Sequence, residues 1–211
     1  MNEGVLARLS GVLAVVAFVV AVVIDEASGP PAGDATGAEI ASYLNDNVYA
    51  LAFAALAWGI GTIFLLVFMD ELRERLAASP RFARVGFPLG LGAAVLLLAS
   101  WLPEVGGALA SREELHRELE PGAAEVFSSI GTGFFFGGEL LLAGFLLAVG
   151  LATVATRVLP VWLGWVTLVL GVVALVPPVG WAVVVFAFPL WLLLVSALLW
   201  RSSRPATLQP V

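Results

Sequence analysis

Six hydrophobic stretches alternate with polar or turn-forming segments along the sequence, and this pattern predicts the fold. The stretches cover about residues 5–24, 48–69, 85–102, 127–154, 160–176 and 179–200. A bilayer core of roughly 30 Å requires about 20 apolar residues in a helix that crosses it. We therefore predict an all-α, polytopic membrane bundle of six transmembrane helices, with residues 1–211 forming a single membrane domain.

Within the first stretch, the apolar run from Gly11 to Ile24 has the length found in a secretory signal peptide and follows a basic residue, Arg8. The residues after it, Asp25-Glu26, do not form a small-residue cleavage site. We therefore predict that this segment is retained as a transmembrane helix, and its cleavage is the alternative.

The two long loops, 25–47 and 103–126, are predicted to contain short interfacial helices. Gly37–Leu44 has apolar residues at helical spacing. Ser111–Glu120 begins with the spacing of a capping box, in which a serine and a glutamate three residues later satisfy each other's backbone amides. The polar triplet Asn45-Asp46-Asn47 is expected to cap the helix that follows it.

The placement of arginine predicts the orientation of the chain. All ten basic residues are Arg, and eight of them lie in the two terminal tails and in the loops after the second and fourth spans. The other two, Arg112 and Arg117, lie in the loop after the third span. Because cytoplasmic segments carry an excess of basic residues, both termini are predicted to be cytoplasmic. The acidic residues follow the opposite pattern, with eleven of the sixteen in the two long loops.

Composition narrows the classes of function. Only 12% of the residues are charged, about half the share of an ordinary soluble domain, and the net charge of −6 does not favour nucleic-acid binding. The absence of Cys and the single His exclude disulfides, thiolate metal ligands and a His-rich metal site within one chain. No nucleotide-binding loop, nucleophile elbow or metalloprotease helix is present in the sequence. We therefore assign no catalytic residue, no metal and no cofactor, and the lipid bilayer is the expected partner.

Small residues predict the faces through which the spans pack, since they let helix backbones approach closely in lipid. These positions are Ala54, Ala57 and Gly61 in the second span, Gly86 and Gly90 in the third, and Gly133, Gly137 and Gly144 in the fourth. The faces are expected to serve packing within the chain, a homo-oligomer or a membrane-protein partner. Four tryptophans near span ends fit interfacial belts, namely Trp101, Trp162, Trp181 and Trp200.

Glu139 is the only ionisable residue expected to be buried deep within a span, and it is the strongest candidate for function. A carboxyl group near the middle of a span usually faces the bundle interior or a hydrated cavity, and burial favours its neutral form. Ser128 and Thr132 lie on the same side of this helix, and counting 1.5 Å per residue places Thr62 and Thr167 within about one helical turn of it in depth. These five residues form the predicted intramembrane polar site. It is either a proton, cation or ligand site or a protonated Glu satisfied by its neighbours.

Short motifs carry a resemblance to a bacterial family. They are Ala38-Glu39-Ile40-Ala41-Ser42-Tyr43-Leu44, the exit Asp70–Arg75, Leu159-Pro160-Val161-Trp162-Leu163-Gly164-Trp165, Phe188-Pro189-Leu190-Trp191 and Trp200-Arg201. With these motifs the chain resembles a group of uncharacterised six-span integral membrane proteins of actinobacteria. It is also similar to the group catalogued as domain of unknown function 4386, through Phe136-Gly137 to Gly144. The resemblance implies a bacterial plasma-membrane protein and transfers no activity.

Three functions remain open from the sequence. The first is a proton- or ion-linked transport or permeation unit that uses Glu139, and it is non-enzymatic. The second is a structural or accessory subunit of a membrane complex, in which the small-residue faces serve only packing. The third and weakest is a membrane enzyme that acts on lipid or envelope precursors with the loop acids Glu113, Glu114 and Glu120.

Overall fold

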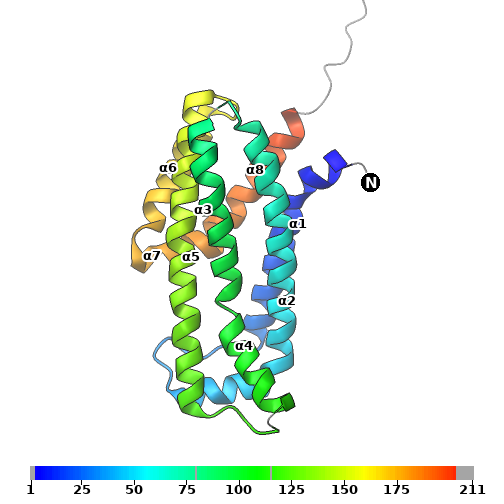
Figure 1. The fold of residues 1–211 in the computed structure, drawn as a ribbon, viewed down its shortest axis with the longest axis vertical. Helices are drawn as coiled ribbons and strands as arrows, with labels where there is room; N and C mark the ends of the chain where they lie inside the picture. Colours follow the sequence, from blue (N-terminus) through cyan, green and yellow to red (C-terminus); the bar gives the residue numbers. More distant parts are fainter. Residues whose placement is uncertain (1–2, 79, 115, 203–211) are drawn as a thin grey trace, which may run out of the picture.

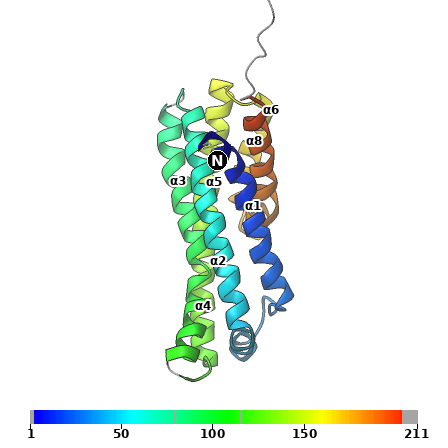
Figure 2. The ribbon, with the colours of Figure 1, turned by 90° about the vertical axis from the view of Figure 1, so that its right-hand side faces the viewer.

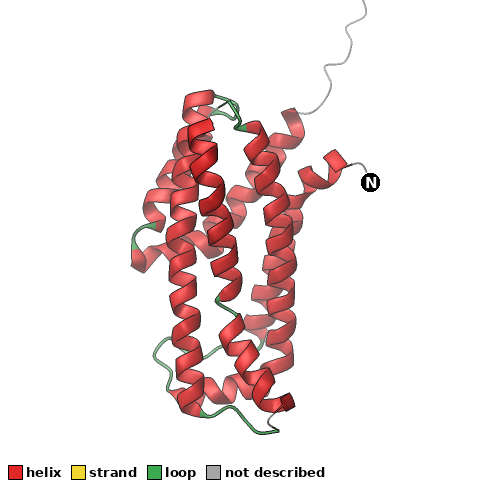
Figure 3. Ribbon diagram, viewed as in Figure 1, coloured by secondary structure: helices red, strands yellow, loops and turns green. Residues whose placement is uncertain are grey.

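A computed structural model describes residues 3–78, 80–114 and 116–202, and the described chain is helical without a strand (Figure 3). The elements are α1 (Glu3–Ala27), α2 (Gly37–Arg75), α3 (Pro80–Ala99), α4 (Leu102–Leu109), the π-helical turn η1 (Ala110–Glu114), α5 (Pro121–Thr156), α6 (Val161–Ala174), α7 (Pro177–Ala182), the π-helical turn η2 (Val183–Ala187) and α8 (Phe188–Ser202). The predicted all-α class is confirmed for these residues.

Five helical segments of the described chain are long and apolar enough to cross a membrane. They are Leu9–Ala27, Gly37–Arg75, Arg84–Glu113, Pro121–Thr156 and Val179–Arg201. The remaining apolar helix, Val161–Ala174, has 14 residues and is therefore roughly 21 Å long. A multi-pass membrane architecture follows from these lengths, whereas the count of six spans stays a prediction.

The two long helices, α2 and α5, give the bundle its length (Figure 1). α1 begins and α8 ends at the same end of the bundle, which we call the terminal end (Figures 1 and 2). α2 and α5 begin at the opposite end, which we call the loop end (Figure 1). α1 lies along α2, and α3 lies along α5.

The predicted separate helix Gly37–Leu44 is the first part of α2. Thr36 caps α2, because its hydroxyl accepts from Glu39 N at 3.4 Å and its own amide donates to Glu39 Oε2 at 2.7 Å. This capping box was missed from the sequence, and the predicted cap at Asn45-Asp46-Asn47 is wrong because the helix runs through it. Asn45 instead accepts from Leu119 N at 2.8 Å and donates to Leu119 O, so it ties α2 to the segment before α5.

The predicted helix at Ser111–Glu120 is also wrong. Helical structure here begins at Leu102, where Pro103 occupies a first-turn position that needs no amide hydrogen, and it ends at Glu114. Ser111 therefore lies near the end of a helix rather than at its cap. The reason is burial, since Val105 and Ala108 of α4 belong to a second core at the loop end.

The last three helices form a hairpin that stops part of the way along α5. A Cβ at Gly164 would lie 3.2 Å from Gly150 O, and one at Gly171 would lie 3.0 Å from Leu147 N, so α6 runs back along α5. At the hairpin turn, Gly180 meets the carboxyl group of Glu139. Figure 1 shows α7 near mid-height, and α8 returns from there to the terminal end along α1.

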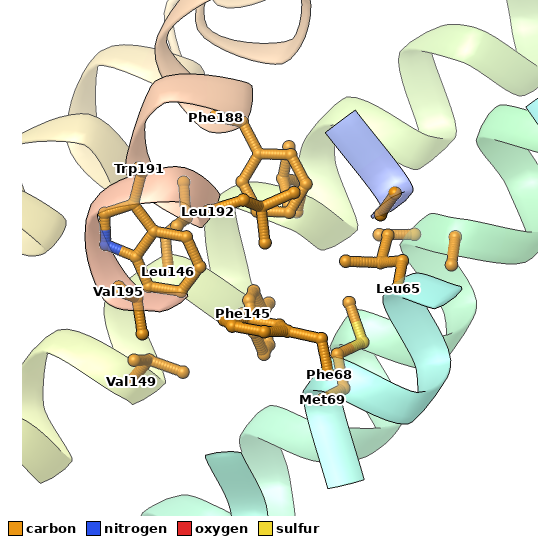
Figure 4. Packing of buried hydrophobic residues seen from close by; sticks show 14 of the residues in the cluster. Leu65, Phe68, Met69, Phe145, Leu146, Val149, Phe188, Trp191, Leu192 and Val195 are labelled. Carbon is orange, nitrogen blue, oxygen red and sulfur yellow. The ribbon is translucent and has the colours of Figure 1, made fainter. Parts of the chain in front are cut away.

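The main hydrophobic core joins α2, α5 and α8 in the terminal half of the bundle (Figure 4). The Trp191 ring stacks on Phe188 with ring centroids 5.7 Å apart and meets Phe68 and Phe145 edge-on at 6.1 and 6.2 Å. Its indole Nε1 donates to Thr167 Oγ1 at 2.8 Å, which joins α8 to α6. The aromatic cluster thus fixes the hairpin to the bundle, and one buried hydrogen bond ties the two arms of the hairpin together.

Candidate functional site

Glu139 lies on α5 at the hairpin turn, and only 3% of its surface is exposed. Its Oε1 has no hydrogen-bond partner in the described part of the chain. Counting 1.5 Å per residue, it lies roughly 20–27 Å from the flanking charged residues Glu125 and Arg157. Buried polar side-chain atoms nearly always have a partner, so an unpartnered carboxyl oxygen at this position points to a function or to a bound group.

The structure does not bond Glu139 to either of the two threonines that the sequence ranked as its partners. Thr62 donates to Trp58 O at 3.0 Å, within its own helix. Thr167 donates to Leu163 O at 2.7 Å and accepts from Trp191. Both hydroxyls are therefore used elsewhere.

The depth predicted for Thr167 is wrong. It lies between Gly164 and Gly171, which contact Gly150 and Leu147 of α5, so it is two or more helical turns from Glu139. The close glycine contacts set the register of α6 on α5, and sequence counting from the span ends could not predict them. The depth predicted for Thr62 is consistent with the structure, because Thr62 lines a pocket with Leu97, and Leu97 contacts Gly138.

The other two predicted site residues, Ser128 and Thr132, lie along α5 toward the loop end. Thr132 is two helical turns from Glu139 and only about 20° from it around the helix axis. It lines a large cavity beside α5, and Ser128 lies close to the carboxyl group of Glu104. The predicted stripe therefore connects Glu139 with a cavity, rather than with the two threonines.

This space, which we call the Trp58 cavity, has a volume of about 650 Å³. It lies under the hairpin turn, between α1, α2, the junction of α3 with α4, and α5. Its lining residues are Val22, Asp25, Glu26, Trp58, Ser100, Trp101, Glu104, Gly131, Thr132, Phe135, Trp181, Val185 and Phe186. The size falls within the range of small-molecule sites.

The Trp58 cavity combines carboxyl groups with aromatic rings. Asp25, Glu26 and Glu104 lie toward the loop end, and Asp25 Oδ1 accepts from Tyr43 Oη at 2.6 Å. The Trp58 ring lies 5.7 Å from Trp101, between centroids. Sequence reasoning missed this site because it counted the acids as loop charge.

Two tryptophans of the Trp58 cavity, Trp101 and Trp181, were predicted to lie in interfacial belts. Both line the cavity, and Trp181 comes from α7 at the hairpin turn. Trp181, Trp162 and Trp200 are all exposed, so the interfacial belts stay a prediction. The signal available in the sequence was limited to Trp101, which lies three residues before Glu104 at the end of one span.

A second space, the Leu65 pocket, continues the Trp58 cavity toward the terminal end. It shares Val22, Trp58, Val185 and Phe186 with the cavity and has a volume of about 190 Å³. Its remaining lining residues are Phe18, Val19, Thr62, Leu65, Ala94, Leu97, Val184, Phe188 and Pro189. The only polar side chain among them is Thr62, whose hydroxyl is bonded to its own helix, so the pocket is apolar.

Most of the predicted small-residue positions pack within the chain. A Cβ at Gly90 would lie 2.7 Å from Phe145, and one at Gly61 would lie 2.6 Å from Phe18. A Cβ added at three further glycines would lie 3.0–3.1 Å from a neighbouring side chain, namely Gly86 from Ala148, Gly137 from Leu96 and Gly144 from Leu89. Ala54 is buried and Ala57 is half-buried. Gly133 is the exception, because nothing lies within 4 Å of its Cβ position, so its predicted packing role within the chain is wrong.

The loop acids proposed for an enzyme have local partners. Glu113 accepts from the Tyr49 hydroxyl, and Glu120 pairs with Arg117 at 3.3 Å. The side chain of Glu114 lies outside the described residues. Within the described chain, no group of three or more His, Cys, Asp or Glu residues is arranged to hold a metal ion.

The chain has no match among protein-family models, curated proteins or solved structures. The family resemblance of its short motifs therefore stays a prediction, and the function has to be inferred from the geometry of Glu139 and the two connected spaces.

Proposed function

We propose that the protein is a small transport or permeation unit of the bacterial plasma membrane, in which Glu139 binds and releases a proton or cation. The observation that carries this proposal is the buried, unpartnered carboxyl oxygen of Glu139. Ionisable residues at such depth typically mark ion pathways and proton relays. Glu139 lies at the turn of a short hairpin and on the same face of α5 as Thr132 of the Trp58 cavity, two helical turns away, so this cavity is the proposed route for a proton to the loop end.

The topology that we propose for this activity keeps both termini in the cytoplasm. The excess of arginine at the terminal end supports this orientation, and it places the mouth of the Trp58 cavity outside. In the predicted six-span arrangement, α6 and the helix from α7 to α8 would each cross the whole bilayer. We favour instead four complete crossings and one re-entrant hairpin, which leaves both termini on the same side.

Helix register supports the re-entrant hairpin. Arg73 lies 4.9 Å from the Phe87 ring centroid, and the neighbouring Gly86 contacts Ala148 of α5. Charged residues of α2 are therefore level with Ala148, and we propose that this level is the edge of the hydrocarbon region. Glu139 lies nine residues further along α5, or roughly 13 Å, which is about half of a 30 Å core. With this placement, the hairpin turn at Gly180 would lie near the middle of the bilayer, and the helix Val179–Arg201 would not cross it completely.

The two alternative functions have weaker support. A scaffold would need free packing faces, whereas the small-residue faces are occupied within the chain except at Gly133. An enzyme would need converging reactive groups, whereas Glu113 and Glu120 are bound to local partners.

The experiment is a proton-flux measurement in liposomes that contain the purified protein and an entrapped pH indicator. A potassium diffusion potential drives protons inward, and protein-free liposomes give the background. We expect flux through the wild-type protein and a loss of at least about tenfold in Glu139→Gln, because the amide keeps the shape of the side chain but cannot exchange a proton. Glu125→Gln is the matched control, since this residue is exposed on the same helix. A wild-type flux equal to background, or an unchanged flux in Glu139→Gln, would refute the proposal.

A further inference from the structure

We propose that the Trp58 cavity and the Leu65 pocket together bind a lipophilic organic cation. The cationic centre would lie against the carboxyl groups of Asp25 and Glu104, and the apolar groups would lie among the tryptophans and in the Leu65 pocket. The assignment names a substrate class for the transport proposed above and rests on that proposal for its biological meaning. Binding itself can be measured without transport.

Charge is the first argument. The three carboxyl groups of the cavity have no basic partner within the described chain, where the ion pairs are Arg73–Asp70, Arg75–Glu71 and Arg117–Glu120. Asp25 and Glu104 are close enough to repel each other, and both are half-buried. A cation placed between them would relieve this repulsion, whereas an anion such as a lipid phosphate would increase it.

Aromatic lining is the second argument. Five rings line the cavity, those of Trp58, Trp101, Phe135, Trp181 and Phe186. The face of an aromatic ring attracts a cation, most strongly when the ring is that of tryptophan, and cages of such rings recognise quaternary ammonium groups. The rings come from α2, α5, α7, η2 and the turn before α4, so a ligand among them would contact the bundle and the hairpin together.

Shape is the third argument. The two spaces share four lining residues and run from a mouth with carboxyl groups to an apolar end. A strongly polar solute such as a sugar would find few hydrogen-bonding groups beyond the mouth. A ligand with one charged centre and bulky apolar groups matches the order of the lining.

Glu139 supplies an independent observation next to the cavity wall. Its unpartnered Oε1 lies on the α5 face that carries Thr132, and the side chain meets Gly180, the neighbour of Trp181 in the cavity wall. This carboxyl group is more than nine-tenths buried, and it contacts the residue that precedes Trp181 of the cavity wall. Movement of the hairpin would exchange contact with Gly180 for contact with the ligand.

The test compares two ions of the same shape and opposite charge, tetraphenylphosphonium and tetraphenylborate, by calorimetric titration of the full-length protein in neutral detergent. We expect saturable binding of the phosphonium only. The double variant Asp25→Asn, Glu104→Gln should lose at least about tenfold in affinity, because two charge contacts are removed. The amide oxygen introduced by Asp25→Asn can still accept the hydrogen bond from the Tyr43 hydroxyl. The matched control is Glu118→Gln, Glu125→Gln, which removes the same charge outside the cavity and should bind as the wild type does.

Equal binding of the two ions, or wild-type affinity in the double cavity variant, would overturn the assignment. If that variant does not elute as a single folded species, Trp181→Leu replaces it, since this ring is half-exposed in the cavity wall and a tenfold loss is again expected. Failure here leaves the proton flux of the liposome experiment intact, and only the substrate class is then wrong. Binding without any proton flux would show a cation site in a protein that does not transport by the proposed route.

Discussion

Gly180 is the position where the structure leaves no room for a side chain, because the hairpin turn contacts Glu139 there. A Cβ added at Gly180 would overlap the Glu139 carboxyl group and would lie 2.7 Å from Ala174 O. One neighbour is the end of a side chain and the other is backbone, so moving a rotamer cannot relieve both contacts. Overpacking of this kind typically costs about 1–3 kcal/mol of unfolding free energy. For a chain of this size, that corresponds to a fall in melting temperature of roughly 2–12 °C.

The measurement is thermal unfolding of purified Gly180→Ala in detergent, followed by tryptophan fluorescence. The same substitution is repeated in a Glu139→Ala background, where only the backbone contact remains. We expect the cost of Gly180→Ala to be smaller there by about 1 kcal/mol, because the two residues interact directly. Gly133→Ala is the control, since its Cβ position is open, and it should leave the stability unchanged or raise it through the higher helix propensity of alanine. If Gly180→Ala is harmless, or costs the same with and without the Glu139 carboxyl group, the hairpin turn does not lie against Glu139.

Three further outcomes are expected. Thr167→Val should lower the unfolding free energy by about 1–2 kcal/mol, because it leaves the buried Trp191 Nε1 without its acceptor. This effect should be smaller in a Trp191→Phe background, and additive effects in the double-mutant cycle would contradict the hydrogen bond. Gly137→Leu should lower the melting temperature through overpacking against α3, while Gly133→Leu should not, and equal losses would contradict the helix faces assigned here. Val176→Cys in this cysteine-free chain should resist membrane-impermeant thiol reagents applied to intact cells, because an exposed residue at a re-entrant turn faces lipid; rapid labelling from outside would restore the six-span arrangement.

The helical elements were largely predictable, because backbone hydrogen bonds in lipid must be satisfied within each segment. The apolar stretch 127–154 became most of α5, and small residues such as Gly90 and Gly137 became contacts between α3 and α5. Helix ends were less predictable. Ser111 does not cap a helix, because the buried residue Val105 belongs to a helix that begins earlier in the chain. Asn45 does not cap a helix either, because it accepts a hydrogen bond from Leu119 N instead.

The candidate site was predictable only in its central residue. Glu139 was recognised because a buried carboxyl group is costly wherever the helices lie. Its neighbours depend on the register between helices, which the contacts Gly164–Gly150 and Gly171–Leu147 set on α5. Because of this register, Thr167 lies away from Glu139, and Gly180 contacts it.

The sequence by itself determined an all-helical chain for a membrane, with one carboxyl group buried in an apolar helix, because hydrophobic length and the cost of burying charge are local properties. Only the tertiary structure decided that the last hairpin stops beside Glu139 and leaves the Trp58 cavity beneath it. That space exists because α6 is shorter than the helix against which it packs. The carboxyl groups and tryptophans around it come from segments far apart in the chain, and only the packing of the helices brings them together.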